Sequence, residues 1–232
     1  MELPRFLDVA TSMFSTVSRL GAGLQARRPA HRPARLLELY EFEGCPYCRK
    51  VRDALTELDL DAMIYPCPAG GTVYRPRAVA LGGKAQFPFL VDPNNGKRLY
   101  ESDDIVAYLF ATYGGREPGI LARGPLATAS SMLASAFRPA FGARARPSHR
   151  PAHPLELWSF EASPFCRIAR ETLSELELPY VLHNVGKDGA GRPDFVARSG
   201  KMMVPYLVDP NTGREMFESA EIRRYLNETY GA

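Results

Sequence analysis

Residues 37–49, which read LELYEFEGCPYCR, return 118 positions later as residues 155–167, LELWSFEASPFCR. Further along, FPFLVDPNNG at 87–96 returns as VPYLVDPNTG at 204–213, an offset of 117. Ahead of these stretches, Ser12-Met13 is matched by Ser131-Met132. Self-similarity at a fixed spacing indicates a repeated structural unit. The chain is therefore predicted to contain two copies of one unit, each with its own leader.

Each copy is predicted to run strand, helix, strand, helix, two strands and a final helix, because apolar residues alternate in the short segments and recur every three to four residues in the longer ones. In the first copy these elements are expected at 37–42, 46–58, 63–65, 75–81, 88–92, 97–100 and from Ser102 onward. In the second copy the matching later elements are expected at 181–183, 194–198, 205–209, 215–217 and from Ser219 onward. The two serines have the chemistry of N-cap residues. The first crossover should join parallel strands with a right-handed turn.

The leaders are predicted to be amphipathic helices at residues 1–24 and 125–142. In the first, Phe6, Val9, Met13, Val17 and Leu20 have the spacing of one helical face, which we expect to pack on a module, with membrane attachment as the alternative. The stretches 26–35 and 143–154 are rich in Pro, Arg and His and are expected to be extended, self-repelling linkers. A cleaved presequence would have no internal twin, so the leader is read as part of the repeat.

Composition narrows the function. The 232 residues are 45% hydrophobic and carry a net charge of only +3, much of it in the two arginine-rich stretches. This pattern does not favour nucleic-acid binding, and no apolar run reaches the roughly 18 to 20 residues of a membrane span. Four cysteines are too few for a disulfide scaffold, and a Cys-x-x-Cys beside a βαβ pattern indicates redox chemistry in a reducing compartment, so the cytoplasm is expected.

The βαβαββα order, the CPYC at 45–48, the proline that opens the third strand and the Glu-Ser at the last helix together resemble the thioredoxin-fold module of glutaredoxins and of the glutathione S-transferase N-terminal domain. The resemblance covers about residues 37–114 and 155–231. It implies an α/β protein of two tandem thioredoxin-fold modules, each preceded by a short helix and a basic Pro-rich linker. The expected division is 1–36 helix and linker, 37–115 first module, 116–153 helix and linker, and 154–232 second module.

The CPYC motif places Cys45 just before a predicted helix, where the helix N-terminus stabilises a thiolate. Cys45 is the expected nucleophile, and Cys48, one turn further, is the expected resolving thiol. A zinc half-site is the structural alternative, but the chain offers no second Cys-x-x-Cys. An iron–sulfur cluster held through Cys45 and glutathione is not expected, since the family relatives that hold one often carry a different, monothiol motif.

The resemblance also implies glutathione as co-substrate, with a cis peptide bond before each strand-opening proline exposing backbone to the tripeptide. The expected glutathione-binding residues are Tyr47, Phe87, Pro88, Glu101 and Ser102 in the first module and Ser163, Val204, Pro205, Glu218 and Ser219 in the second. Simple N-capping remains an alternative role for the serines.

The second copy has Ser163 at the nucleophile position, so it cannot run a dithiol cycle. Its hydroxyl could hydrogen-bond a glutathione thiolate or only cap the helix. Cys166 is expected to be a core residue, and Cys67 is either a second resolving thiol or a buried one.

Three functions follow from these residues. The leading one is a glutathione-linked thiol-disulfide oxidoreductase that acts on disulfide or glutathionylated substrates through Cys45 and Cys48. The alternatives are a glutathione S-transferase-like enzyme, although the chain lacks the all-helical domain that normally builds the electrophile pocket, and a non-catalytic thioredoxin-fold scaffold, which a buried Cys45 would favour. The sequence does not set the oligomeric state.

Overall fold

The computed structural model describes residues 4–232. In the first half, the elements are β1 (Leu37–Glu41), α2 (Pro46–Glu57), β2 (Ala62–Pro66), α3 (Tyr74–Gly82), β3 (Phe89–Asp92), β4 (Lys97–Leu99), α4 (Ser102–Leu109) and the π-helical turn η1 (Phe110–Gly114). In the second half, they are β5 (Leu155–Ser159), α6 (Pro164–Glu175), β6 (Tyr180–Asn184), α7 (Arg192–Ser199), β7 (Tyr206–Asp209), β8 (Arg214–Phe217) and α8 (Ser219–Tyr230). The two leader helices are α1 (Arg5–Val17) and α5 (Pro125–Ala136). The predicted α/β fold of two βαβαββα modules is confirmed.

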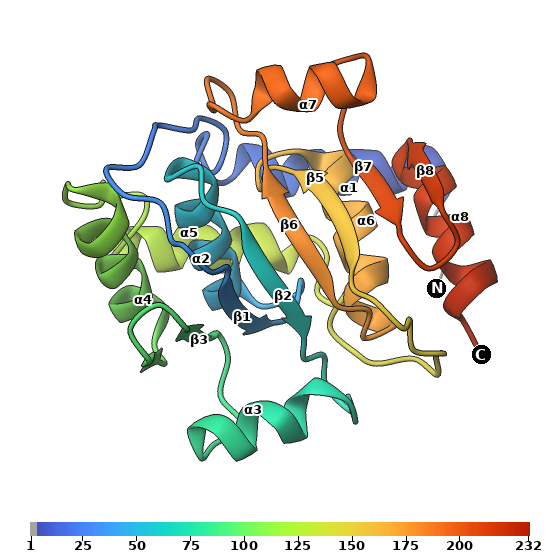
Figure 1. The fold of residues 1–232 in the computed structure, drawn as a ribbon, viewed down its shortest axis with the longest axis horizontal. Helices are drawn as coiled ribbons and strands as arrows, with labels where there is room; N and C mark the ends of the chain where they lie inside the picture. Colours follow the sequence, from blue (N-terminus) through green and yellow to red (C-terminus); the bar gives the residue numbers. More distant parts are fainter. Residues whose placement is uncertain (1–3) are drawn as a thin grey trace.

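The two modules share one eight-stranded sheet with the order β4-β3-β1-β2-β6-β5-β7-β8. Within each module the first two strands are parallel, and the hairpin strands are antiparallel. The modules join where β2 pairs antiparallel with β6, at the centre of Figure 1. At this junction Met63 pairs with Val181, its own counterpart in the repeat. A local twofold axis therefore relates the two halves.

The helix after the first strand packs on the sheet through one face. In α2 that face contains Cys48, Val51, Leu55 and Leu58, each at most 1% exposed, as the spacing predicts. The equivalent residues of α6 continue the same apolar core across the junction. On the opposite face of the sheet, Tyr40 and Phe89 pack with Ala78 of α3.

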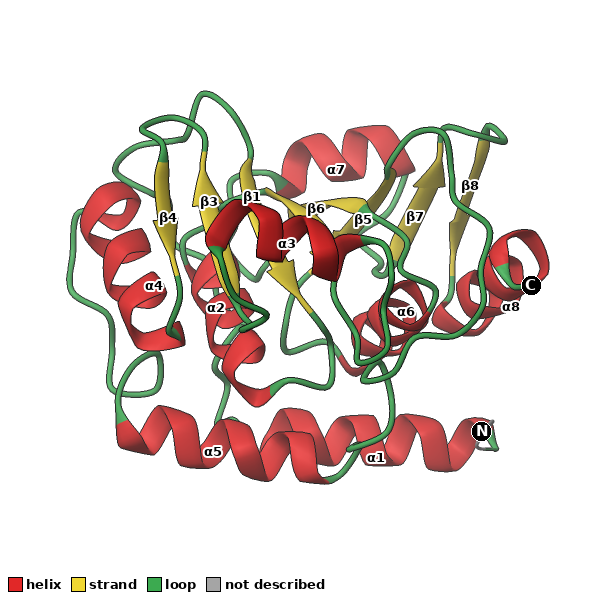
Figure 2. Cartoon of the chain, turned by 90° about the horizontal axis from the view of Figure 1, so that it is seen from below, coloured by secondary structure: helices red, strands yellow, loops and turns green. Residues whose placement is uncertain are grey.

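The leader helices form an outer layer below the helices of the modules, where they lie side by side (Figure 2). The helix α1 precedes the first module but packs on α6 of the second, and α5 precedes the second module but packs on α2 of the first. Ser12 donates a hydrogen bond to the backbone oxygen of Pro164 (2.7 Å), and its counterpart Ser131 donates to that of Pro46 (2.6 Å). The leaders are thus exchanged between the repeats.

The prediction of which face of the first leader helix packs on a module is wrong. Phe6, Val17 and Leu20 are 80%, 62% and 72% exposed, whereas Asp8 and Ser12 are buried. The reason is electrostatic, since Asp8 pairs with Arg138 and Arg223 at 2.7 Å, and these partners lie far along the chain. The helices are also shorter than the predicted 1–24 and 125–142, and residues 1–3 lie outside the described part of the chain.

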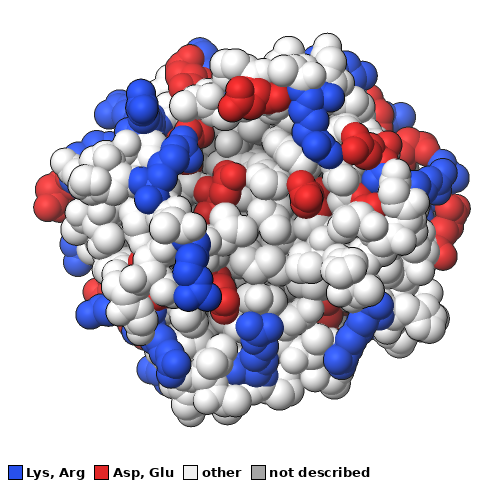
Figure 3. Space-filling model, in the orientation of Figure 1, with Lys and Arg blue, Asp and Glu red and all other residues white. Residues whose placement is uncertain are grey.

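The basic stretches at 26–35 and 143–154 are extended, but the prediction that they are self-repelling linkers is wrong. Their backbones bond to the modules, with the N–H of Arg27 donating to Glu57 and that of His149 donating to Tyr230. In each stretch an arginine pairs with a carboxylate: Arg32 with Asp59 at 2.6 Å and Arg146 with Glu175 at 2.8 Å. Figure 3 shows Lys and Arg interspersed with Asp and Glu on the face drawn, so the basic residues there form no continuous patch.

Candidate active site

Cys45 caps the N-terminus of α2. Its Sγ accepts a hydrogen bond from the backbone N–H of Cys48 at 3.3 Å, as the position before a helix predicts. A hydrogen bond from the Cys48 thiol and the backbone N–H groups of Cys48 and Tyr47 hold the pKa of Cys45 below its usual value, although burial acts in the opposite direction. The local structure therefore favours the Cys45 thiolate, even though the residue is only 4% exposed.

The other three cysteines differ from Cys45 in the direction in which their pKa is shifted. All four cysteines are free and buried. Burial raises the pKa of Cys48 well above its usual value, and burial likewise raises the pKa of Cys166 and of Cys67. These three thiols are poor nucleophiles until their surroundings change.

A pocket of about 320 Å³ lies beside the start of α2. It is lined by Tyr47, Gln86, Phe87, Pro88, Glu101 and Ser102. The structure thus brings together the five residues proposed for glutathione in the first module, and the Phe87–Pro88 bond is cis as expected. Cys45 is not among the lining residues. Gln86, whose side-chain amide donates to the Glu101 carboxylate, was not among the predicted glutathione-binding residues, because this contact depends on how the segment between α3 and β3 folds.

The predicted N-cap roles of Ser102 and Ser219 are wrong. Each serine is the first helical residue, and the cap position belongs to Glu101 or Glu218, whose φ angles are +62° and +69°. Such a left-handed backbone is uncommon for a residue with a side chain. In both modules it turns the glutamate toward the pocket that it lines and leaves the serine hydroxyl beside the helix N-terminus.

The second module has a larger pocket of about 620 Å³, with a mainly apolar wall. It contains all five residues proposed there: Ser163, Val204, Pro205, Glu218 and Ser219. The Val204–Pro205 bond is also cis. Ser163 Oγ accepts the N–H of Cys166 at 3.2 Å, which is the capping role. Met13 of α1, together with Leu24, supplies part of the wall, so a leader helix extends this pocket beyond the module itself.

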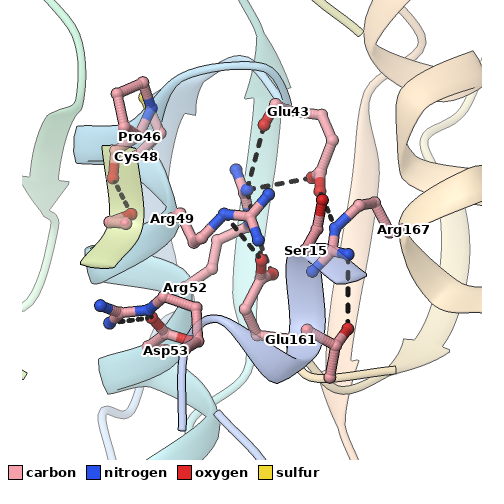
Figure 4. A network of polar contacts seen from close by, with 12 residues as sticks. Ser15, Glu43, Pro46, Cys48, Arg49, Arg52, Asp53, Glu161 and Arg167 are labelled. Atoms are coloured by element: carbon pink, nitrogen blue, oxygen red, sulfur yellow. Dashed lines mark hydrogen bonds and ion pairs between the residues drawn. The ribbon is translucent and has the colours of Figure 1, made fainter. Parts of the chain in front are cut away.

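Buried arginines and glutamates join α2 and α6, as Figure 4 shows in close-up. Glu161 Oε2 contacts Arg52 of α2 at 2.9 Å and Arg170 of α6 at 2.8 Å. Burial alone would raise the pKa of Glu161, but the surrounding arginines hold it far below the usual value. Glu43 makes the equivalent pair with Arg170 at 2.9 Å. We call these four side chains the ion network.

Sequence reasoning missed the ion network. Its signal was present in both copies, because Glu43 and Arg52 of the first recur as Glu161 and Arg170 of the second. Glutamates and arginines in such positions are ordinarily solvated. The four side chains of the ion network are 3% exposed or less, because the β2–β6 junction brings the two modules together around them.

No group of three or more His, Cys, Asp or Glu side chains suited to a metal ion occurs within residues 4–232. None of the described helices has the length and apolar character needed to cross a membrane.

The paired α/β modules define a tandem thioredoxin-fold protein. The model of the glutathione S-transferase N-terminal domain matches residues 39–117 and again residues 157–232, more than half of the chain, so the chain belongs to this family and contains its domain twice.

Two solved structures are similar to the chain. A glutathione transferase of Bombyx mori is 30% identical over 37% of this chain and 39% of that one, with a TM-score of 0.31. A trimeric glutathione transferase of Leishmania is 14% identical over 86% of this chain and 68% of that one, with a TM-score of 0.30. The chain thus spans about two fifths of the Bombyx mori enzyme. No curated protein matches it.

Proposed function

We propose that the first module is a glutathione-dependent thiol-disulfide oxidoreductase in which Cys45 is the nucleophile. The observation that carries the proposal is the Cys45 sulfur at the helix start, with donors that lower its pKa. The neighbouring pocket of Tyr47, Pro88 and Glu101 supports glutathione as the co-substrate, because it combines a cis-proline backbone with a carboxylate and a helix N-terminus.

The proposed cycle begins when the Cys45 thiolate attacks the glutathione sulfur of a mixed disulfide. The substrate sulfur leaves as a thiolate and takes a proton from water, and Cys45 is left in a disulfide with glutathione. A second glutathione thiolate then attacks that glutathione sulfur, which yields glutathione disulfide and regenerates Cys45. In the other route Cys48 attacks the Cys45 sulfur, releases glutathione as a thiolate and leaves a Cys45–Cys48 disulfide, and the burial that raises the pKa of Cys48 acts against this step.

The burial of Cys45 favours the non-catalytic scaffold, the alternative with which the proposal competes. The chain at 141–143 lies against Gly44, where an added Cβ would come within 3.1 Å of the Phe141 oxygen. Turnover therefore requires the substrate sulfur to reach Cys45 past this segment or through the Tyr47 pocket.

The test measures reduction of a peptide–glutathione mixed disulfide by the full chain in the presence of glutathione. We expect Cys45→Ser to reduce the rate to the uncatalysed level, Cys48→Ser to keep most of it, and the control Cys67→Ala to match the unmodified chain. Activity that survives in Cys45→Ser, or that never appears, rejects the proposal and leaves the scaffold.

Glutathione transfer by the second module is a second candidate, because its 620 Å³ pocket has the apolar wall that such a reaction needs. Part of this wall comes from Met13 of α1 and from Leu24. Conjugation of glutathione to an apolar electrophile that is lost in Ser163→Ala and unchanged in Cys45→Ser would establish this activity, and would separate it from the redox activity of the first module.

We also propose the cytoplasm as the location, because a reducing compartment keeps Cys45 and Cys48 as free thiols.

A further inference from the structure

The two leader helices expose large apolar side chains. Phe6, Phe14, Val17 and Leu20 from α1 and the turn after it, and Leu126 and Leu133 from α5, are between 53% and 80% exposed. We call these six residues the leader face. The rings of Phe14 and Phe137 stack with centroids 6.0 Å apart, which connects the two helices across this surface.

The leader face carries no exposed charge. Between Phe6 and Leu24 the charged residues are Asp8 and Arg19, and both are buried. Arg5, the first residue of α1, is exposed and pairs with Glu218 at 3.8 Å. Between Pro125 and Ala143 the charged residue is Arg138, which is also buried. Surface helices of water-soluble proteins normally direct their polar side to solvent. The leader helices have the reverse orientation, with the apolar side toward solvent and the buried charged residues toward the modules.

The inversion is fixed by specific bonds. Arg19 pairs with Asp53 of α2 at 2.6 Å, and its counterpart Arg138 pairs with Asp8 at 2.7 Å. Turning either helix to bury its apolar side would leave these buried charges without partners, which is strongly unfavourable. The leader face therefore cannot be covered by its own chain and stays on the surface of each folded copy.

The size of the face identifies the kind of partner. Side chains of this type present roughly 150 to 200 Å² each when fully exposed, so the six expose on the order of 700 Å². The largest apolar patch of a typical monomer is about 300 to 600 Å². A standard interface buries about 800 Å² on each side.

We propose that the leader face is the interface of a homodimer, covered by the leader face of a second copy. The interfaces of homodimers are more apolar than those of transient complexes, which matches a surface without charge. The helices α1 and α5 are themselves related by the internal twofold axis, so two such layers pack face to face with like residues on both sides. Helices that bind a membrane surface carry Lys and Arg along their exposed sides. Here Arg19 and Arg138 are buried just after the ends of the helices, and the exposed Arg5 is at the first residue of α1, where it pairs with Glu218 at 3.8 Å.

The test is the mass of the full chain in solution, measured by light scattering and sedimentation over a hundredfold range of concentration. We expect a mass twice that of the 25.7 kDa chain. Val17→Glu and Leu133→Glu should each raise the dissociation constant of the dimer by roughly 30-fold or more, the effect of losing a central contact. The matched control is Val196→Glu, which changes an exposed valine of α7 and should leave the dimer intact.

Val17 and Leu133 are each more than half exposed, so the two glutamate variants should fold like the unmodified chain and keep its circular dichroism spectrum. A chain that stays monomeric at every concentration overturns the proposal, as do glutamate variants that remain dimers. A monomer that sediments with anionic lipid vesicles overturns it in favour of a membrane surface.

Discussion

A single atom distinguishes the two candidate active-site positions, Cys45 and Ser163. The backbone N–H of the residue three positions on donates to Cys45 Sγ at 3.3 Å and to Ser163 Oγ at 3.2 Å. The same geometry stabilises a thiolate in the first module and caps a helix with a neutral hydroxyl in the second. The sequence placed Cys45 just before a helix and offered capping as one of two roles for Ser163, because helix starts depend on neighbours in the chain.

The lowered pKa of Cys45 predicts how its alkylation depends on pH. Iodoacetamide reacts with the thiolate, so the rate for Cys45 should reach half its maximum below about pH 8.5, the value for an ordinary cysteine. The rate then falls as the pH drops through this lowered pKa. Replacement of the Cys48 thiol by Cys48→Ala removes its hydrogen bond to Cys45 and should move the midpoint upward.

Mass spectrometry can follow this alkylation at each cysteine. Cys166, fully buried with a raised pKa, is the internal control and should stay unmodified. An identical midpoint in the chain with and without Cys48 would contradict the role given to this hydrogen bond.

Other residue roles could not be predicted in this way. Ser102 and Ser219 have the right chemistry for a cap, but the left-handed backbone of Glu101 and Glu218 moves the cap by one residue. That backbone conformation is imposed by the turn between the last strand and the helix, which residue preferences do not specify.

At the scale of elements, hydrophobic spacing found the strands and helices of each module and failed on the leaders. The helix at α1 exists, but its apolar side faces solvent, because Asp8 and Arg19 have buried partners. Those partners, Arg138 and Asp53, come from other elements, so spacing within one helix cannot reveal them.

The ion network couples α2 to α6, and its removal should destabilise the whole chain. Glu161→Gln leaves Arg52 and Arg170 buried with too little negative charge, so we expect the free energy of unfolding to fall by about 3 to 5 kcal/mol. Urea denaturation followed by circular dichroism measures this loss.

The exposed Glu228→Gln of α8 is the control for this substitution, and it should change stability by less than about 0.5 kcal/mol. A Glu161→Gln chain as stable as the control would mean that the ion network contributes nothing net.

At the scale of the molecule, the repeat was visible in the sequence, but the way in which its copies assemble was not. Nothing in residues 62–66 or 180–184 marks these strands as partners, because both also suit the interior of a module. The exchange of the leaders was hidden for the same reason, since it depends on where the two modules sit after they pair.

The shared sheet predicts that neither half folds alone. If the chain is divided between residues 115 and 116, the first half loses the strand β6 that pairs with its β2, and the second half loses β2. The ion pairs between the halves, such as Glu43–Arg170, are also lost. We expect each half alone to lack a cooperative thermal transition and to aggregate through the exposed strand edge. Co-expression should restore a soluble complex.

Calorimetry of the separate halves and of the co-expressed pair tests this expectation. Two halves that each melt cooperatively as soluble monomers would show instead that the modules are independent domains joined by contact.

The pairing of Met63 with Val181 also bears on how the two sites came to differ. Two separate identical chains could form this same junction, but every substitution would then appear in both sites at once. Because one polypeptide encodes both halves, a mutation changes one site and spares the other. The chain can therefore hold Cys45 in one half while Ser163 occupies its place in the other, an asymmetry that a dimer of identical single modules could not inherit.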